Sequence, residues 1–313
     1  MCARPATRSI RASRRVPMPV AVSTASTSAS VPRRQKNSPA PSQMNVRGAP
    51  GGFSSGAFFV VVAMALAVSP GCADAAACEL PGPGETARVA RVIDGDTLAL
   101  ADGRHVRMLG INAPELGHEG APAEPLARTA KAALEQLLGA DHRTGRTAAA
   151  VTLHVDRERL DHYGRLLAHV SSSGRNLELE LLRQGLAYQV VIPPNMALTE
   201  CLSAAERTAR TAHLGLWSPS AAGPTASTAI THGGYQRVRG RVERVLFGAT
   251  WWIEFEGGFR AVIYPEHQQY WERQTLAAWR GRAVEVRGWV YRGKRGDWRM
   301  RLPTPDAVPA PAS

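Results

Sequence analysis

Residues 87–111 of the 313-residue chain read ARVARVIDGDTLALADGRHVRMLGI. Apolar and basic or small side chains alternate over 87–93, and alternation resumes at Thr97–Leu100 after the Asp94-Gly95-Asp96 turn. Asp102-Gly103 is typical of a hairpin, and residues 105–111 alternate again. This stretch therefore predicts three strands joined by tight turns.

Further elements follow along the chain. Apolar side chains recur at helical spacing over Ala123–Leu138, and Gly139 is a typical residue at a helix C-terminus. Strands are expected at Ala148–Val155 and Leu166–Ser171, and helices at Leu177–Leu186 and Leu198–Leu214. A β-barrel with helices packed outside it fits this order, and so does a generic α+β fold.

A second domain is expected after residues 218–231, a stretch rich in Ala, Ser, Thr, Gly and Pro that we interpret as a linker. Of the 19 aromatic residues, 13 lie in 231–313. One helix-like segment, Gln268–Trp279, interrupts five strand-like stretches: Tyr235–Leu246, Thr250–Glu256, Phe259–Tyr264, Ala283–Tyr291 and Asp297–Leu302. This is the element order of an OB-fold, so we expect a smaller β-barrel at 232–306 and a disordered tail at 307–313.

The N-terminal residues are interpreted as a leader. Residues 1–43 contain no Asp or Glu and no hydrophobic periodicity, which predicts a disordered upstream extension. Residues 44–75 resemble a secretory signal peptide, with a 12-residue apolar core at Ala57–Val68 and small residues before Ala76. We therefore expect a secreted or periplasmic mature chain. The alternative is an organelle transit peptide.

The formal net charge of +12 by itself suggests a polyanionic partner. Residues 1–75 carry +8 of it, residues 76–230 carry −2 and residues 231–313 carry +6. Recognition of nucleic acid must therefore depend on particular arginines, because most of the excess charge lies in the expected leader. No apolar run reaches the roughly 18 residues of a membrane span, so no integral membrane segment is expected in the mature chain.

Several kinds of site are missing from the sequence. There is no P-loop, no dinucleotide-binding glycine motif and no Gly-x-Ser-x-Gly motif. Only Cys78 and Cys201 remain in the expected mature chain, too few for a thiolate zinc site. In an exported protein this pair predicts a disulfide, and two unrelated thiols are the alternative.

Three clusters of polar residues lie at predicted strand ends and turns. They are Asp94-Gly95-Asp96-Thr97, Arg107 with Asn112-Ala113-Pro114-Glu115, and Asp161-His162-Tyr163-Gly164-Arg165. Each alone is compatible with an ordinary turn or an exposed charge. Together they supply oxygen ligands for Ca²⁺ or Mg²⁺, a carboxylate base and two guanidiniums that match phosphate oxygens. Hydrolysis of a phosphodiester requires these parts.

Residues 85–217 resemble the staphylococcal nuclease (thermonuclease) family, because the three clusters occur in that family's order. The segments Leu182–Ala187 and Leu216–Ser218 also match its pattern. The resemblance implies an OB-type five-stranded β-barrel with three helices over residues 76–217. It also implies a Ca²⁺-dependent endonuclease that cleaves DNA and RNA, with Mg²⁺ as the less expected ion.

The resemblance assigns metal ligands residue by residue. Asp96, the Asn112 side chain and the Ala113 carbonyl would bind the ion, and Asp94 would support them. Many members of the family have Asp at the position of Asn112. Since calcium affinity follows the charge of the ligands, Asn112 predicts weaker Ca²⁺ binding.

The resemblance likewise implies the catalytic roles. Glu115 would be the general base that activates water. Arg107 and Arg165 would bind the phosphate and stabilise the charge that develops on it, and Tyr163 would contact a substrate phosphate.

In the second domain, alternation predicts an outward face that carries Arg287, Trp289 and Tyr291. Guanidiniums and exposed rings together suit single-stranded nucleic acid, which offers phosphates and bases. The alternative is a solvated basic face without function, with the aromatic residues packed against the first domain.

The sequence thus predicts an exported metal-dependent endonuclease that acts as a monomer on DNA, RNA or both. The competing hypothesis is a catalytically silent nucleic-acid-binding protein built from two OB-type barrels. The set of Glu115, Arg107 and Arg165 separates the two, because binding alone does not need it.

Overall fold

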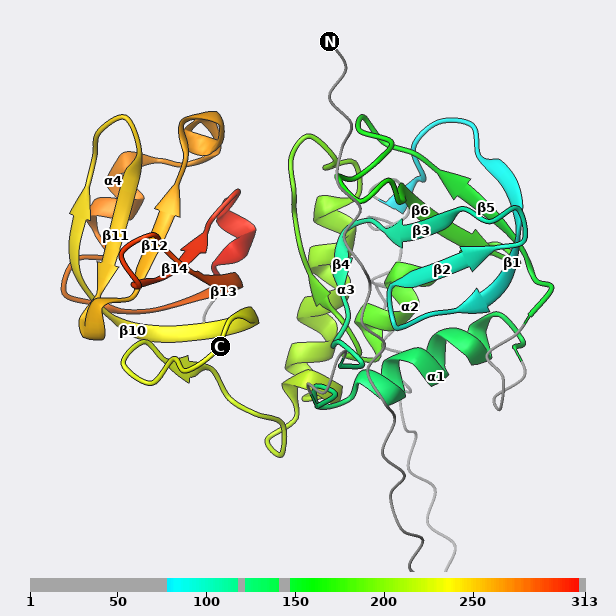
Figure 1. Ribbon diagram of the computed structural model, residues 1–313, viewed down its shortest axis with the longest axis horizontal. Coiled ribbons are helices and arrows are strands. Elements are labelled where there is room, and N and C mark those ends of the chain that lie inside the picture. The colour runs from blue at the N-terminus through cyan, green and yellow to red at the C-terminus, as the bar shows by residue number, and fades with distance from the viewer. Residues whose placement is uncertain (1–77, 118–121, 141–146, 310–313) are drawn as a thin grey trace, which may run out of the picture. The chain divides into compact units, whose positions relative to one another are not determined.

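The computed structural model describes residues 78–117, 122–140 and 147–309, which form two closed five-stranded barrels with a few helices (Figure 1). The predicted fold class is confirmed. The predicted upstream extension at 1–43 and signal peptide at 44–75 lie outside the described residues. Within the described ranges, no helix is long and apolar enough to cross a membrane.

The first barrel closes through one parallel strand pair. Its strands follow one another in the order β3-β2-β1-β5-β6, and β3 pairs with β6 to complete the ring. The other neighbours in the ring are antiparallel. The strands are β1 (Glu85–Val92), β2 (Thr97–Leu100), β3 (His105–Met108), β5 (Ala150–His154) and β6 (Leu166–Ser172), and β7 (Arg175–Asn176) extends the sheet beyond β6.

A bulge in β1 changes which side chains of the strand face the core. Strict alternation from Ala87 and Val89 would turn Arg91 toward the core. The register between β1 and β2 shifts between Val89 and Arg91, so Val92 is buried instead and Arg91 is exposed. One extra residue in a strand has this effect, because it transfers every later side chain to the other face.

Three helices complete the first barrel: α1 (Ala127–Leu137), α2 (Leu177–Arg183) and α3 (Thr199–Thr211). Helix α1 begins four residues later than predicted. Pro125 disfavours helical backbone at the residue before it, and Leu126 adopts a left-handed conformation with φ of 67°. The Asn176 side chain caps α2 by accepting the N–H of Leu179 at 2.8 Å.

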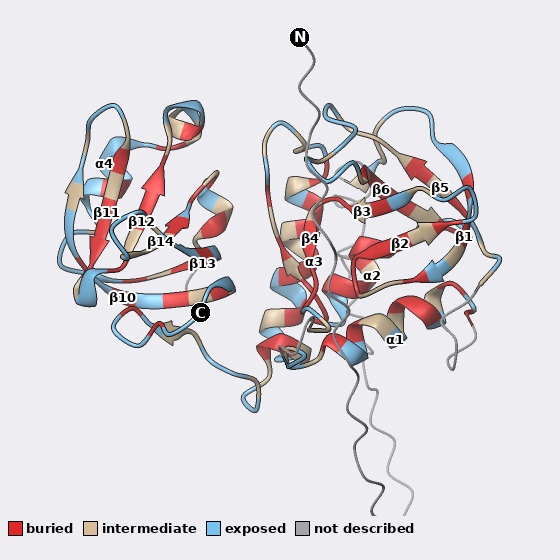
Figure 2. Ribbon diagram, in the orientation of Figure 1, coloured by how far each residue is buried: buried red, intermediate tan, exposed pale blue. Residues whose placement is uncertain are grey.

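The second barrel has the order β11-β12-β14-β13-β10, and pairing of β11 with β10 closes it. Its buried residues form a separate apolar core, and Figure 2 shows buried residues along its strands. The strands are β10 (Gly234–Leu246), β11 (Trp251–Phe255), β12 (Arg260–Ile263), β13 (Ala283–Arg292) and β14 (Trp298–Arg301).

The predicted helix at Gln268–Trp279 is wrong as a single element. A 3₁₀ helix, η4 (Pro265–Tyr270), and the short helix α4 (Arg273–Ala277) take its place. Trp271 separates them in extended backbone, with φ of −122°. Its ring is buried against the edge of Trp279, with 5.9 Å between ring centroids. Burial of this large ring outweighs continuation of the helix.

The stretch predicted as a linker is partly built into the second barrel. Strand β9 (Thr225–Ala226) pairs in parallel with β10, and Ile230 joins the second core. At the other end, η5 (Pro305–Ala307) buries Ala307 in the same core, one residue into the predicted tail.

Arg287 is not on a solvated face, so that part of the prediction is wrong. Its side chain is 4% exposed, and Nη1 lies 2.7 Å from each carboxylate oxygen of Glu206 on α3. Its Nη2 donates to the side-chain amide oxygen of Gln189, Oε1, at 2.9 Å. Gln189 belongs to β8 (Tyr188–Gln189), which pairs with β4 (Ile111–Asn112). The charge expected to meet solvent therefore joins the two barrels.

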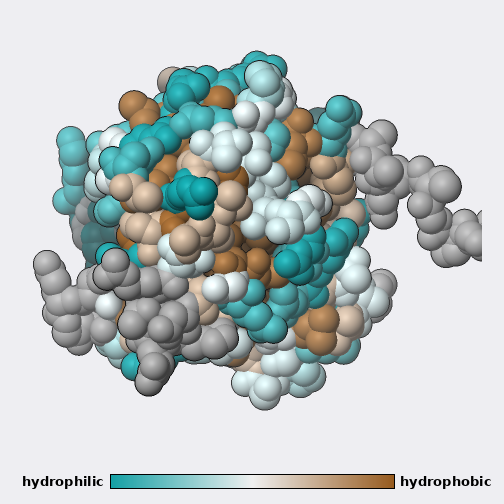
Figure 3. Space-filling model, turned by 90° about the vertical axis from the view of Figure 1, so that its right-hand side faces the viewer, coloured by the Kyte–Doolittle hydropathy of each residue, from teal (hydrophilic) through white to brown (hydrophobic). Residues whose placement is uncertain are grey.

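The surface of the molecule mixes residue types. Figure 3 shows one face, on which hydrophilic and hydrophobic residues are interspersed. Apolar atoms contribute much of any folded protein's surface, so this face alone indicates no interaction site.

Cys78 and Cys201 form a disulfide in the structure, with 5.2 Å between their Cα atoms. Cys201 lies on α3 and is 3% exposed. The bond joins the first described residue to the last helix of the first barrel, 123 residues later in the chain.

Loss of this disulfide should lower the free energy of unfolding by about 2–5 kcal/mol, because it closes a long loop in the unfolded chain. Urea unfolding of Cys201→Ser against the oxidised parent measures the change. Peptide mapping without reductant provides the check on the bond itself. Recovery of Cys78 and Cys201 in separate alkylated peptides would contradict the pairing.

Glu178 on α2 is a fully buried carboxyl group. Its Oε1 accepts the N–H of Val170 at 2.7 Å, and burial raises the pKa of Glu178 to about 8. Because the folded pKa lies above the ordinary value of 4.5, the carboxyl's contribution to stability is complete below about pH 4.5. It is lost as the pH rises through about 8.

Glu178→Gln keeps the acceptor for Val170 and removes the titration. Thermal unfolding across this pH range should show that the variant retains stability where the parent loses more than about 1 kcal/mol. Glu180→Gln, on the same helix but more exposed, is the matched control. His169 Nδ1 lies 3.9 Å from Glu178 Oε1, and burial lowers the pKa of His169 to about 4, below the pH range of this experiment. Equal pH dependence of parent and Glu178→Gln would refute the assignment.

Candidate active site

Asp96 is the buried centre of the first cluster. It immediately precedes β2 and is 3% exposed. Its Oδ1 accepts the Thr97 hydroxyl at 3.0 Å, and its Oδ2 accepts the N–H of Ala113 at 2.7 Å. Burial raises the pKa of Asp96 to about 6, although Arg107 opposes the shift. A buried carboxylate of this kind is stabilised by cations close to its oxygens.

The turn before Asp96 explains why two aspartates flank a glycine. Asp94 Oδ1 accepts the N–H of Asp96 at 3.0 Å and so holds the turn. A Cβ atom on Gly95 would lie 2.6 Å from the Cβ of Ala113. Only glycine therefore lets the turn approach Ala113 closely enough for the Asp96 hydrogen bond.

Arg107 connects the strands around this carboxylate. Its Nη2 lies 3.2 Å from Asp96 Oδ2 and donates to Asn112 Oδ1 at 3.1 Å. Its Nη1 donates to the backbone oxygens of Met108 at 2.6 Å and Ile111 at 2.9 Å. The guanidinium is therefore fixed in place by four oxygens, and its side chain remains 14% exposed.

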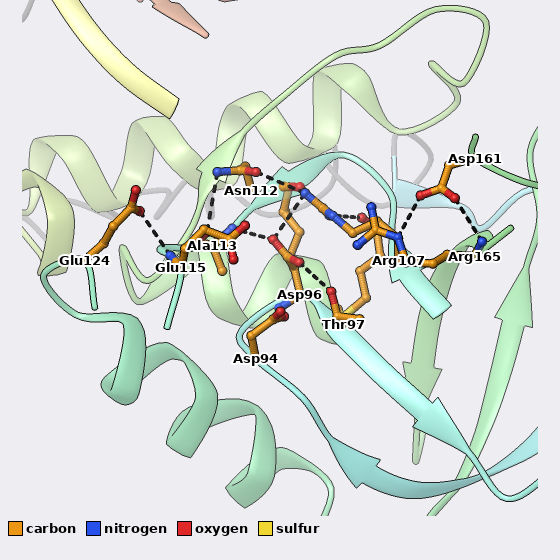
Figure 4. A network of polar contacts seen from close by, with 12 residues as sticks. Asp94, Asp96, Thr97, Arg107, Asn112, Ala113, Glu115, Glu124, Asp161 and Arg165 are labelled. Carbon is orange, nitrogen blue, oxygen red and sulfur yellow. Dashed lines mark hydrogen bonds and ion pairs between the residues drawn. The ribbon is translucent and has the colours of Figure 1, made fainter. Parts of the chain in front are cut away.

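Glu115 follows β4 and is exposed. Its backbone is held by Glu124: the Glu115 N–H donates to Glu124 Oε2 at 3.0 Å, and the Glu124 N–H donates to the Glu115 carbonyl at 2.8 Å. In the view of Figure 4, Glu115 and Glu124 lie on the side of Asp96 and Asn112 away from Arg165. No sequence pattern predicted a role for Glu124, because its two hydrogen bonds join positions nine residues apart.

The third cluster is an ordered turn before β6. Asp161 Oδ1 accepts the N–H groups of Tyr163 and Arg165, each at 2.9 Å, and Oδ2 accepts Arg165 Nε at 2.7 Å. Interaction with Arg165 and the turn amides lowers the pKa of Asp161 against the effect of burial. Tyr163 is 73% exposed, and the Arg165 guanidinium lies 5.5 Å from its ring centroid.

Arg107 and Arg165 line one cavity of about 550 Å³, together with Tyr163. The parallel pairing of β3 with β6 explains this, because it places Arg107 opposite Leu167, two residues after Arg165. The structure thus brings both predicted phosphate-binding arginines to one cavity. Asp96, Asn112 and Ala113 adjoin Arg107 through hydrogen bonds.

The predicted metal ligands fit a hard divalent cation by their chemistry. Asp96, Asn112 and Ala113 offer carboxylate, amide and carbonyl oxygens within one hydrogen-bonded group. Among the described residues there is no cluster of three or more His, Cys, Asp or Glu side chains that could hold a metal. The candidate set therefore contains one buried carboxylate and two neutral oxygens, consistent with modest affinity.

The first barrel matches known proteins. A model of the family described as "Staphylococcal nuclease homologue" matches residues 105–219. The thermonuclease of Staphylococcus intermedius is 33% identical over 137 residues, which cover 43% of this chain and 77% of the relative. The thermonuclease of Staphylococcus hyicus is 31% identical over 137 residues, covering 43% and 76%. Endonuclease YncB of Bacillus subtilis is 30% identical over 135 residues, covering 42% and 60%.

Barrel, polar clusters and relatives together define the class of the protein as a nuclease, a phosphodiester hydrolase. The chain belongs to the staphylococcal nuclease family. The family match ends at residue 219, before β9, so the second barrel lies outside it.

Asn112→Asp tests the metal-ligand assignment. The added charge should lower the Ca²⁺ concentration for half-maximal activity by about tenfold, equivalent to ~1.4 kcal/mol of binding free energy. Calorimetric titration with Ca²⁺ provides a readout independent of activity. Asn176→Asp adds the same charge at the N-terminus of α2 and serves as the control. An unchanged Ca²⁺ requirement in Asn112→Asp would exclude Asn112 as a ligand.

Proposed function

We propose that this protein is an exported, Ca²⁺-dependent endonuclease that hydrolyses phosphodiester bonds of DNA, RNA or both. The observation that carries the proposal is the position of Arg107. Its guanidinium contacts Asp96 and Asn112 and also lines the cavity that contains Arg165. Candidate metal ligands and candidate phosphate-binding groups thus meet at one side chain.

The two arginines would bind the scissile phosphate. Arg107 is held by four protein oxygens, and Arg165 is oriented by Asp161, so neither side chain needs to reorganise when a phosphate enters. Preorganised guanidiniums stabilise negative charge as it develops on phosphate oxygens during attack. Tyr163 beside Arg165 would contact a substrate phosphate through its hydroxyl.

Glu115 would remove the proton from the attacking water. Its exposed position and its hydrogen-bonded backbone suit a base that must meet solvent at a fixed place. Asp96, Asn112 and Ala113 would hold the ion, with Asp94 supporting the turn. A bound divalent cation would supply electrostatic stabilisation of the phosphate and of the nucleophile.

Export is part of the proposal and is supported by the leader-like residues 44–75 and by the Cys78–Cys201 disulfide. Disulfides persist in oxidising compartments and are rare in the cytosol. Sequencing of the N-terminus of the protein recovered from outside the cytoplasm tests this point. Cleavage before Ala76 is the expected result.

Glu115→Gln tests the catalytic assignment. The variant should lower kcat by about 10²–10⁴-fold on plasmid DNA with Ca²⁺, because it removes the base and keeps the size of the side chain. EDTA should abolish cleavage by the parent. Glu124→Gln still offers an oxygen to the Glu115 N–H, so it should retain activity and serves as the matched control.

The outcome that contradicts the proposal is a pure parent protein that binds nucleic acid but shows no metal-dependent cleavage. That result would favour a catalytically silent binding protein. Full activity of Glu115→Gln would instead leave the enzyme class intact and exclude this base.

A further inference from the structure

Trp289, on β13 of the second barrel, lines the cavity that contains Arg107 and Arg165. The side chain is 43% exposed, although an indole of this size is usually mostly covered. A large ring thus stands in the same cavity as the two guanidiniums proposed to hold the scissile phosphate.

Trp289 is held in position by a series of aromatic contacts. The edge of its ring system meets Tyr235, with 5.1 Å between centroids. Tyr235 stacks on Tyr188 at 5.2 Å, and Tyr188 contacts Trp217 edge-on at 5.5 Å. Tyr188 belongs to β8, the strand that pairs with β4 and its Asn112. Packed rings of this kind reduce the motion of the exposed indole before any ligand binds.

The buried ion pair of Arg287 adds a second restraint. Arg287 lies two residues before Trp289 on β13, so both side chains lie on the same face of the strand. Its bonds to Glu206 and Gln189 hold that face against α3 and β8. Removing one partner of such a buried pair is costly, so this contact persists in the folded protein.

A second cavity, of about 290 Å³, continues from the first. The two cavities share three lining residues: Val190, Ile192 and Trp289. The second one is also lined by Tyr291 and Arg301. Tyr291 is 36% exposed, and Arg301 is exposed on β14. A ring and a cation therefore line the second cavity, which shares Trp289 with the first cavity but is not lined by Arg107.

From this arrangement we propose that the second barrel extends the substrate site, and that Trp289 stacks on an unpaired base next to the scissile phosphate of a single-stranded nucleic acid. The proposal deepens the proposed function and rests on it for the position of the scissile phosphate. Tyr291 and Arg301 would meet the next base and phosphate along the strand.

Single strands are selected by this geometry because a base in a duplex is already stacked and paired. A ring that accepts a base face gains little from duplex DNA, whereas each stacked unpaired base contributes substantially to affinity. The recognition is insensitive to base identity, since every base has such a face. DNA and RNA single strands share this chemistry.

Equilibrium binding to fluorescently labelled oligothymidine and oligouridine, followed by anisotropy in EDTA, tests the proposal without cleavage. Trp289→Ala should weaken binding of the tighter-bound strand by about tenfold, whereas Trp289→Phe should stay within about threefold of the parent. Binding of a labelled duplex of the same length should change less than about twofold, because its bases are already stacked.

Trp252→Ala is the matched control, because Trp252 is a partly exposed indole of the same barrel that lines neither cavity. Unfolding curves of both alanine variants verify that they fold. With Ca²⁺, Trp289→Ala should raise KM for the single strand and leave kcat nearly unchanged.

Three results would overturn the proposal: no binding of either strand by the parent, the same affinity in Trp289→Ala as in the parent, or an equal loss in Trp252→Ala or on duplex DNA. These results differ from failure of the proposed function, which would appear as absent metal-dependent cleavage by the parent protein. A silent binding protein would still show the Trp289 effect in EDTA.

Discussion

The guanidinium of Arg107 is the constraint on which the candidate site depends. It is mostly buried, and a buried charge needs charged or hydrogen-bonded partners at short range. Asp96, Asn112 and two backbone carbonyls provide them from the turn before β2, from β4 and from the end of β3. Because the partners come from three segments, the charge fixes their relative positions as well as its own.

Buried Glu206 likewise fixes the positions of its partners, here between the two barrels. Glu206 accepts both Arg287 and the N–H of Gln189, so one carboxylate serves a strand of the second barrel and a strand of the first. Loss of either partner of such a pair typically costs about 3–5 kcal/mol, because the other is left as an unpaired buried charge. The contact also continues toward β4, the strand of Asn112. The barrel outside the family match is thus connected to the strand that carries part of the candidate site.

Local sequence patterns were enough to predict most strands, the two barrels and the three polar clusters. Alternation, hairpin residues and helix spacing are properties of neighbouring residues, so they can be recognised from one sequence. The bulge after Val89 could not be foreseen, because it satisfies the core of the closed barrel rather than any local preference. The helix expected at Gln268–Trp279 failed for the same reason, since burial of Trp271 is a tertiary effect.

The candidate site was also predictable only where its residues form a local sequence pattern. The spacing of Asp96, Arg107 and Asn112 in the sequence did predict residues that meet in space. Burial of Arg287 was missed because its partner, Glu206, is 81 residues away and lies in the other barrel. Glu124 was missed because its bonds to Glu115 are made by a loop without a recognisable motif. Contacts between residues that are distant in the chain produce no periodic pattern in the sequence, so one sequence cannot predict them.

The parallel pairing of β3 with β6 joins two segments that are separate in the unfolded chain. Arg107 and Arg165 come together only when this pairing closes the ring, and until then they belong to separate segments. Pairings between distant segments carry a high loop-closure entropy and form slowly. A nascent or partly folded chain therefore holds no assembled pair of these guanidiniums, and the phosphate binding that we propose for them requires the completed barrel.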